Sequence, residues 1–170
     1  MEYLELIKER YSVRSFSDRK VEEEKIDIIL EAGRIAPTAR NLQPQKIYVL
    51  KSEEAMAKMS GITDYTFGAP LVFLFCGDEN VGWVNSFNDR HMTMMDVSIV
   101  ATQMMFAATD IGLGNTWVCR FDTEEVKRQF NLPEGVEPYL ILPVGYASDE
   151  AGPSENHFIR KELEETVEFI

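Results

Sequence analysis

Cysteine, histidine and positive charge are scarce in this chain of 170 residues, and the first two scarcities exclude several kinds of site. Cys76 and Cys119 are the only cysteines, which is too few for a disulfide-stabilised scaffold. Neither belongs to a Cys-x-x-Cys pair, and His91 and His157 are too far apart to form a zinc motif. We therefore expect no metal site.

The shortage of positive charge bears on possible partners. Seventeen Lys and Arg stand against 29 Asp and Glu, a net charge of −12. Such a charge repels phosphate backbones and anionic membranes, so we expect neither nucleic acid nor membrane as a partner. Long apolar runs are also lacking: the first ten residues hold no signal-peptide region, and polar residues interrupt 92–113. A cytoplasmic protein is predicted.

What remains is the composition of a globular protein, with 45% hydrophobic and 27% charged residues and no internal repeat. We expect a single domain over 1–170 with an acidic C-terminal arm, 148–170. Apolar periodicity predicts helices over 3–11, 21–35 and 92–111 and a short helix capped by Asp122, with Glu125 completing a capping box. Strands are predicted at 47–50, 71–76, 116–119, 139–144 and 165–170. This order indicates an α+β fold with one central sheet.

The predicted helix 92–111 is apolar on nearly every side. Such a helix must be covered all round, and a second subunit is the natural source of cover in a small domain. The strand predicted at 165–170 alternates apolar and polar residues, which suits addition to a neighbouring chain.

Four short segments carry groups that suit a ligand. Arg10 and Arg14 bracket Ser12, a pattern that fits an anion but also a solvated helix end. Loop 37–44 offers a hydroxyl and amides that fit the edge of a heterocycle, or simply an ordinary turn. In the segment 113–119, Gly114 would allow the backbone to approach a ligand closely, but it would equally serve to end the preceding helix. The basic pair 160–161 lies in an acidic arm, where it also balances charge.

Taken together and in order, these segments give the chain a resemblance to the FMN-dependent nitroreductase family. The similar stretches span nearly the whole length: RYSVRSF (10–16), APTARNLQPQ (36–45), DVSIVATQMMFAATDIGLGNTWV (96–118), LPVGYA (142–147) and IRKELEE (159–165). The resemblance implies a central, mostly antiparallel sheet flanked by helices, and a C-terminal arm exchanged across a homodimer. It also implies FMN as cofactor, with NADH or NADPH as electron donor and a small-molecule acceptor.

The resemblance implies roles for particular residues. Arg10, Tyr11 and Ser12 belong to the segment that meets the phosphate and ribityl side of FMN, and Arg14 lies near the flavin N1/O2 edge. The loop supplied by the other protomer corresponds to Pro37, Thr38, Ala39, Asn41 and Gln43. Backbone beside the flavin N5/O4 edge corresponds to Trp117, Val118 and Cys119, and the late basic pair at the phosphate to Arg160 and Lys161. No catalytic side chain is implied, because the flavin carries the chemistry.

Some positions depart from the family pattern. Tyr11 stands where a second arginine is frequent, and Thr38 replaces serine but keeps the hydroxyl. Gln45 stands where an aromatic residue is usual, and Cys119, where glycine is common, is followed by the charged Arg120. These departures concern the substrate side more than the phosphate side.

Three hypotheses follow. The first is an oxidoreductase that passes hydride from NAD(P)H through flavin N5 to a nitroaromatic, quinone or similar acceptor by a ping-pong mechanism. The second is an FMN-binding redox sensor or flavin reservoir with little turnover, which Arg120 and Gln45 keep open. The third is a structural module without a cofactor.

Overall fold

The structure is a computed structural model that describes residues 2–170. Its helices are α1 (Tyr3–Glu9), α2 (Glu23–Arg34), α3 (Glu53–Ile62), α4 (Thr93–Asp110) and α5 (Thr123–Phe130). Its strands are β1 (Gln45–Leu50), β2 (Leu71–Asp78), β3 (Val84–Asn85), β4 (Arg90–His91), β5 (Gly114–Asn115) and β6 (Val136–Gly145). Short 3₁₀ turns are η1 (Ala39–Asn41), η2 (Asp64–Thr66), η3 (Glu155–Phe158) and η4 (Leu163–Glu165).

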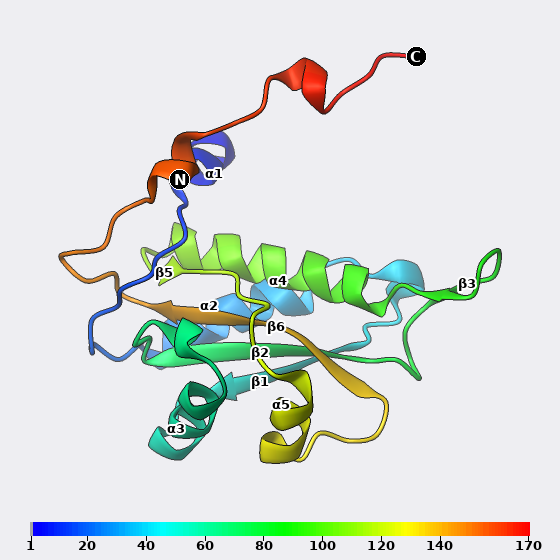
Figure 1. Cartoon of the computed structure of the whole chain (residues 1–170), viewed down its shortest axis with the longest axis horizontal. Coiled ribbons are helices and arrows are strands. Elements are labelled where there is room, and N and C mark those ends of the chain that lie inside the picture. Colours follow the sequence, from blue (N-terminus) through cyan, green and yellow to red (C-terminus); the bar gives the residue numbers. More distant parts are fainter. Residues whose placement is uncertain (1) are drawn as a thin grey trace.

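One antiparallel sheet, ordered β1-β2-β6-β5, organises the chain (Figure 1). Helices α2 and α4 cover one face, and α3 and α5 cover the other. The central strand β2 is buried on both faces, which explains its unbroken apolar sequence. The predicted α+β fold with an antiparallel sheet is therefore confirmed.

Two elements escaped the sequence prediction. Helix α3 was not predicted, although Ser52 caps it by accepting a hydrogen bond from the Ala55 N–H at 3.2 Å. The β3–β4 hairpin, residues 84–91, was also missed, because each of its strands has only two residues. The capping box at α5 is half formed. The Asp122 carboxylate accepts from the Glu125 N–H at 3.0 Å, whereas the Glu125 carboxylate bonds to Arg128.

The prediction of a strand at 116–119 is wrong. Strand β5 covers only Gly114–Asn115, and Val118 forms an isolated bridge with Ile141. Between them the Thr116 N–H donates to the Pro143 carbonyl at 3.3 Å, but proline has no N–H to return. The segment thus runs beside β6, and Pro143 interrupts the ladder.

The strand predicted at 165–170, which was expected to pair with a neighbouring chain, does not form within one chain. The arm contains η3 and η4, and 167–170 have no regular structure. In Figure 1 the arm (red) rises beside α1, and its end lies away from the sheet. A strand requires a neighbouring edge for its hydrogen bonds, and the arm has none within this chain.

No helix among residues 2–170 is long and apolar enough to cross a membrane.

Candidate functional site

The segment that follows α1, residues 10–16, is held against the sheet and forms one side of the candidate site. Helix α1 ends at Glu9, and from Arg10 the chain runs extended so that Ser12 bridges Asn115 of β5. The Val13 N–H donates to the Asn115 carbonyl at 3.0 Å. A Cβ on Gly114 would lie 2.7 Å from the Val13 side chain, so glycine is needed here for packing against this segment. We call residues 10–16 the arginine segment.

The start of the arm returns to the arginine segment. The Ser148 N–H donates to the Ser15 carbonyl at 3.1 Å, and the two serine hydroxyls lie 2.7 Å apart. Farther along, the His157 ring meets the Tyr11 ring edge-on, with centroids 6.4 Å apart. Tyr11, which stands where the family often has arginine, therefore contacts the arm.

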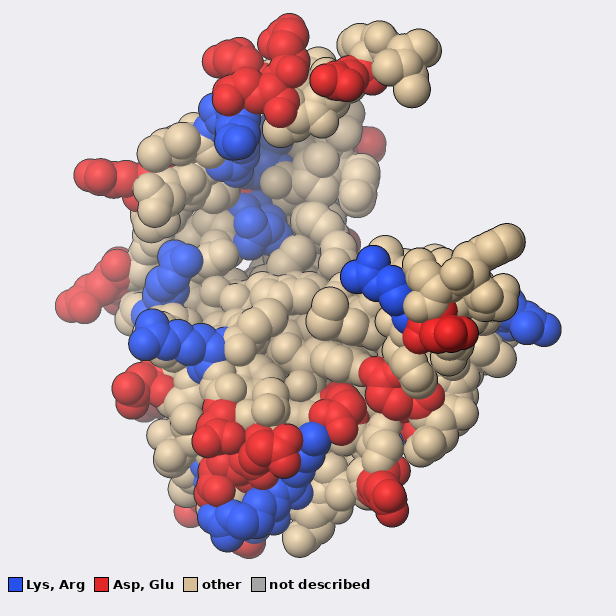
Figure 2. All heavy atoms as spheres, turned by 45° about the vertical axis from the view of Figure 1, so that its right-hand side comes forward, with Lys and Arg blue, Asp and Glu red and all other residues tan. Residues whose placement is uncertain are grey.

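Between the arginine segment and the arm lies a cavity of about 210 Å³. It is lined by Arg10, Ser12 and Arg14 from the first and by Asn156, His157 and Arg160 from the second. Figure 2 shows basic side chains gathered where the arm meets the body, beneath the acidic end of the arm. We call this cavity the arginine cradle.

The arginine cradle carries an excess of positive charge. Among residues 2–170, none of its three guanidiniums forms an ion pair with a carboxylate. Arg14 donates to the Ser12 carbonyl at 3.3 Å, and Arg160 donates to the carbonyls of His157 and Ile159 at 2.5 and 2.7 Å. Burial, and after it the like charge of Arg160, lowers the pKa of Arg10. An anion would relieve this repulsion.

A second cavity, of about 200 Å³, adjoins the first and shares Arg10. Asn115, only 1% exposed, lies in its wall and donates to the Met105 carbonyl at 3.1 Å and to the Thr109 hydroxyl at 3.0 Å. Its side-chain oxygen has no hydrogen-bond partner among the described residues. Sequence reasoning missed Asn115, Asn156 and His157. Asn115 could have been noticed, because it comes immediately after Gly112-Leu113-Gly114 in the sequence.

The loop predicted to bind a ligand through its amides, residues 37–44, has an unusual backbone. Arg40, Asn41 and Gln43 all have positive φ, at 52°, 56° and 52°. Such conformations cost on the order of 1–3 kcal/mol each for non-glycine residues and persist where the surroundings impose them. The Thr38 hydroxyl accepts from the Gln43 N–H at 3.0 Å, and the Gln43 amide donates to the Asn41 carbonyl at 3.2 Å. We call 37–44 the amide loop.

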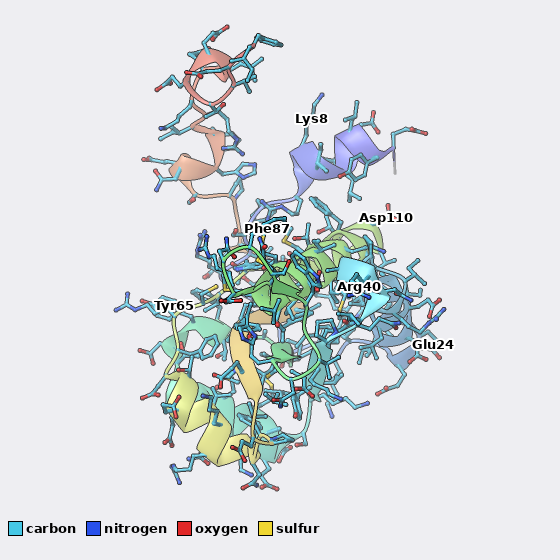
Figure 3. The ribbon with its side chains drawn as sticks, turned by 90° about the vertical axis from the view of Figure 1, so that its right-hand side faces the viewer. Lys8, Glu24, Arg40, Tyr65, Phe87 and Asp110 are labelled. Atoms are coloured by element: carbon cyan, nitrogen blue, oxygen red, sulfur yellow. The ribbon has the colours of Figure 1, made fainter. Side chains whose placement is uncertain are left out.

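The amide loop and the arginine cradle lie at opposite ends of α4. The Ala39 N–H donates to Asp96 in the first turn of α4, whereas Thr109 in the last turn borders the cavity that shares Arg10. At about 1.5 Å per residue, positions 96 and 109 are roughly 20 Å apart along the helix. Figures 1 and 3 place the loop, marked by Arg40, at the same end as the β3–β4 hairpin, marked by Phe87. One chain does not bring the predicted residues of the amide loop to the cradle.

Residues 117–119, predicted to pass beside a flavin, run away from the cradle along β6. The Val118 N–H donates to the Ile141 carbonyl at 3.0 Å, so it is not free for a ligand. Cys119 is exposed, and its sulfur accepts from the Trp117 indole N–H at 3.2 Å. Lys161, also predicted to bind phosphate, is exposed and does not line the cradle.

Arg120, an atypical residue for the family, borders a different cavity of about 510 Å³. Its carbonyl accepts from the Thr63 hydroxyl at 2.7 Å, and its guanidinium lies 5.1 Å from the centre of the Tyr65 ring. Figure 3 shows Tyr65 on the side of the molecule away from Arg40. The Arg120 guanidinium thus lies over the Tyr65 ring in a cavity that Cys119 also lines.

One face of α4 is uncovered. Met94, Met95 and Ile99 are exposed along it, and a groove of about 530 Å³ runs between α4 and Tyr3 of α1. Figure 2 shows an open hollow between the body and the column formed by α1 and the arm. The helix is therefore covered on only part of its surface within one chain.

Comparison with known proteins gives concordant matches. The family model described as "Nitroreductase family" matches residues 7–65 and 61–146. A nitroreductase family protein of Clostridium difficile 630 has a similar crystal structure, with a TM-score of 0.94 and 40% identity over 99% of this chain and 98% of that one.

Two curated relatives are also similar. A Methanothermobacter thermautotrophicus protein, provisionally named NADH dehydrogenase/NAD(P)H nitroreductase, is 31% identical over 89% of this chain and 81% of its own length. The Bacillus subtilis FMN reductase [NAD(P)H] is 25% identical over 88% of this chain and 68% of its own.

Proposed function

This chain belongs to the nitroreductase family, and from that premise we propose that it binds one FMN per protomer in a site shared between two copies of the chain. The protein is an oxidoreductase enzyme that uses FMN and NAD(P)H. The observation that carries the proposed site is the arginine cradle, which three guanidiniums line without a carboxylate partner among residues 2–170.

The arginine cradle fits the phosphate of FMN. Guanidinium groups present planar donor pairs that match phosphate oxygens, and the Ser12 hydroxyl adds another donor. Arg10 and Arg160 repel each other in the absence of an anion, so a doubly charged phosphate would stabilise both. The three guanidiniums suit the terminal phosphate of FMN, which FAD would replace with a bulky adenylate.

A single chain supplies only part of a flavin site. Cofactor pockets usually measure roughly 300–1,000 Å³, and the two cavities at Arg10 are smaller, at about 210 and 200 Å³. A two-fold dimer packed on the uncovered face of α4 would set two α4 helices antiparallel. The amide loop of one subunit would then lie near the arginine cradle of the other. We propose that Thr38, Asn41 and Gln43 reach the flavin in this way.

We propose that the residues of this chain bind FMN and orient its flavin ring. Arg10, Ser12 and Arg160 hold the phosphate, and Arg14 places positive charge where the reduced flavin becomes negative. Among residues 2–170 the Val118 N–H is bonded to the Ile141 carbonyl, whereas the backbone N–H groups of Trp117 and Cys119 have no acceptor, and we propose that the Cys119 N–H serves the N5 edge. When bound, FMN supplies hydride transfer, which requires no protein nucleophile.

We propose a nitroaromatic, a quinone or a similar compound as the electron acceptor, with ping-pong order. NAD(P)H and the acceptor would both have to reach one exposed flavin face, so the first must leave before the second enters. We propose that the Cys119–Arg120 region, whose guanidinium lies over the Tyr65 ring, influences the choice of acceptor.

The visible spectrum tests the proposed function. Purified protein is expected to be yellow, to release FMN and not FAD on denaturation, and to lose its flavin absorbance on anaerobic addition of NADH or NADPH. Menadione should restore the absorbance over many cycles. A flavin that bleaches and recovers only slowly would favour the reservoir, and a protein that stays colourless with added FMN would contradict the proposal.

A further inference from the structure

We propose that Asp96 is a positioning residue for the flavin site: its carboxylate fixes the amide loop in the conformation that presents Asn41 and Gln43 to the FMN of the partner subunit. This inference rests on the proposed function, since the loop contacts flavin only in the dimer described above. It assigns a role to a residue that touches neither phosphate nor reacting atoms.

The first observation is a single contact. The Asp96 Oδ1 accepts the Ala39 N–H at 2.8 Å, across 57 residues of sequence. Within the described residues, this is the only hydrogen bond that leaves residues 38–43, because the others join loop residues to each other. The Pro44 carbonyl also accepts from the Asp78 N–H at 2.9 Å, but that bond fixes the end of the loop that leads into β1. The bond between Asp96 and Ala39 is therefore the one that ties the loop to α4.

The second observation is the backbone of the loop. Arg40, Asn41 and Gln43 adopt positive φ directly after Ala39, the residue that Asp96 holds. A chain released from this anchor would relax toward ordinary φ values, and both amide side chains would change direction. The bond to Ala39 thus controls where the two amides point.

The third observation is the burial of the carboxylate. Asp96 is only 5% exposed, and its Oδ2 has no hydrogen-bond partner among residues 2–170. Burying a carboxylate with only one of its two oxygens hydrogen-bonded destabilises the folded state, and packing of α4 alone would be better served by an apolar side chain. Its position in the first turn of α4 gives some compensation through the helix dipole. The hydrogen bond to the Ala39 N–H explains why a carboxylate occupies this buried position.

A double-mutant cycle on the two partners tests the inference. Asp96→Ala removes the acceptor. Ala39→Pro removes the donor and suits the backbone, because Thr38 before it is extended, at φ −134° and ψ 160°, as a residue preceding proline prefers. FMN dissociation constants are measured on the apoproteins by quenching of flavin fluorescence. Each single variant should bind FMN about tenfold more weakly, and the double variant should be no worse than either.

Two further variants separate positioning from loss of charge or of stability. Asp96→Asn keeps an acceptor for the Ala39 N–H and should bind FMN within about threefold of wild type. Asp27→Ala removes the same charge from an exposed position of α2 and should bind normally. Sedimentation should show that every variant remains dimeric, and apoprotein melting identifies any that fail to fold. If Asp96→Ala is misfolded, Ala39→Pro and Asp96→Asn still decide the matter.

The inference is overturned if Asp96→Ala, folded and dimeric, binds FMN like wild type. It is also overturned if Asp96→Asn is as weak as Asp96→Ala, or if the effects of Asp96→Ala and Ala39→Pro add. Wild-type protein that binds no FMN would contradict the proposed function instead, so the two failures are distinguishable.

Discussion

Among single residues, Arg10 and Arg14 have similar chemistry but different surroundings. Arg10 is partly buried beside the like charge of Arg160, whereas Arg14 is exposed and, within residues 2–170, hydrogen-bonds only to the Ser12 carbonyl. A buried guanidinium that lacks an anion gains most when phosphate arrives. An exposed one contributes less to affinity and can act instead through its field on the flavin ring.

This difference predicts separate effects of two substitutions. Arg10→Ala should weaken FMN binding by about one to two decades, the equivalent of roughly 1.5–3 kcal/mol for a charge-assisted contact. Arg14→Ala should bind FMN more nearly normally and lower the midpoint potential of the bound flavin. Fluorescence titration and spectroelectrochemistry measure the two quantities. Equal effects of both variants on both quantities would show that the roles are misassigned.

Glu22 gives the fold a defined response to acid. The Tyr146 hydroxyl donates to it at 2.7 Å, and this bond, the Glu22 backbone N–H and Arg19 lower the pKa of Glu22 to about 2. A carboxyl whose pKa is lower in the folded state stabilises the protein above its unfolded pKa. That contribution is complete above about pH 4.5 and is lost as the pH falls toward 2.

Glu22→Gln should therefore reduce the acid sensitivity of the fold. Between about pH 5 and pH 2 its free energy of unfolding should decrease less steeply than that of wild type, because the variant has no proton to take up at this position. Glu24→Gln, at an exposed position of α2, is the matched control and should follow wild type. Urea unfolding at each pH measures the slopes, and parallel curves for Glu22→Gln and wild type would refute the assignment.

Helices and strands with a strong apolar pattern of their own were predictable from the sequence. Those whose formation depends on pairing with another strand were not. The sequence predicted α1, α2, α4, β2 and β6 because their own residues define the buried faces. It failed at 116–119, where Pro143 on another strand interrupts pairing. The strand expected at 165–170 needs the edge of a neighbouring chain and stays a prediction.

The candidate site was predictable to a similar extent. Residue types indicated the arginine segment and the amide loop, and the structure shows that Arg160 joins the former. The positive φ angles of the amide loop and its anchor at Asp96 had no signal in the sequence, because they arise from a contact between distant segments. Gly114 was expected either to let the backbone approach a ligand or to end a helix, and in the structure its lack of a side chain makes room for Val13.

The arm is the element whose removal should affect both binding and assembly. Arg160 lines the arginine cradle and Lys161 does not, so Arg160→Ala should account for most of the FMN affinity lost in the double variant Arg160→Ala/Lys161→Ala. Both variants should stay dimeric, since the arm is retained.

Truncation after Ser148 should lose FMN and dimer stability together. Fluorescence titration and sedimentation measure these effects, and a truncated protein that remains a yellow, active monomer would contradict the role of the arm.

At the scale of the whole molecule, the dominant feature is the separation of the arginine cradle from the amide loop, which we propose to be the two halves of one flavin site. The arginine cradle lies at the C-terminal end of α4 and the amide loop at its N-terminal end, while the face of α4 between them is uncovered. A two-fold axis through that face would complete two equivalent sites at once. The central claim is that each flavin site takes its phosphate-binding residues from one chain and its amides from the other.

Complementation between two defective chains tests this claim most directly. One chain carries Arg10→Ala, the other carries Asn41→Ala and Gln43→Ala, and the mixed dimer is isolated through different affinity tags. A shared site predicts that one pocket of the mixed dimer is intact and the other doubly damaged. The mixed dimer should therefore bind one FMN with wild-type affinity, whereas each defective homodimer binds weakly at both sites. A mixed dimer without any site of wild-type affinity would contradict the account.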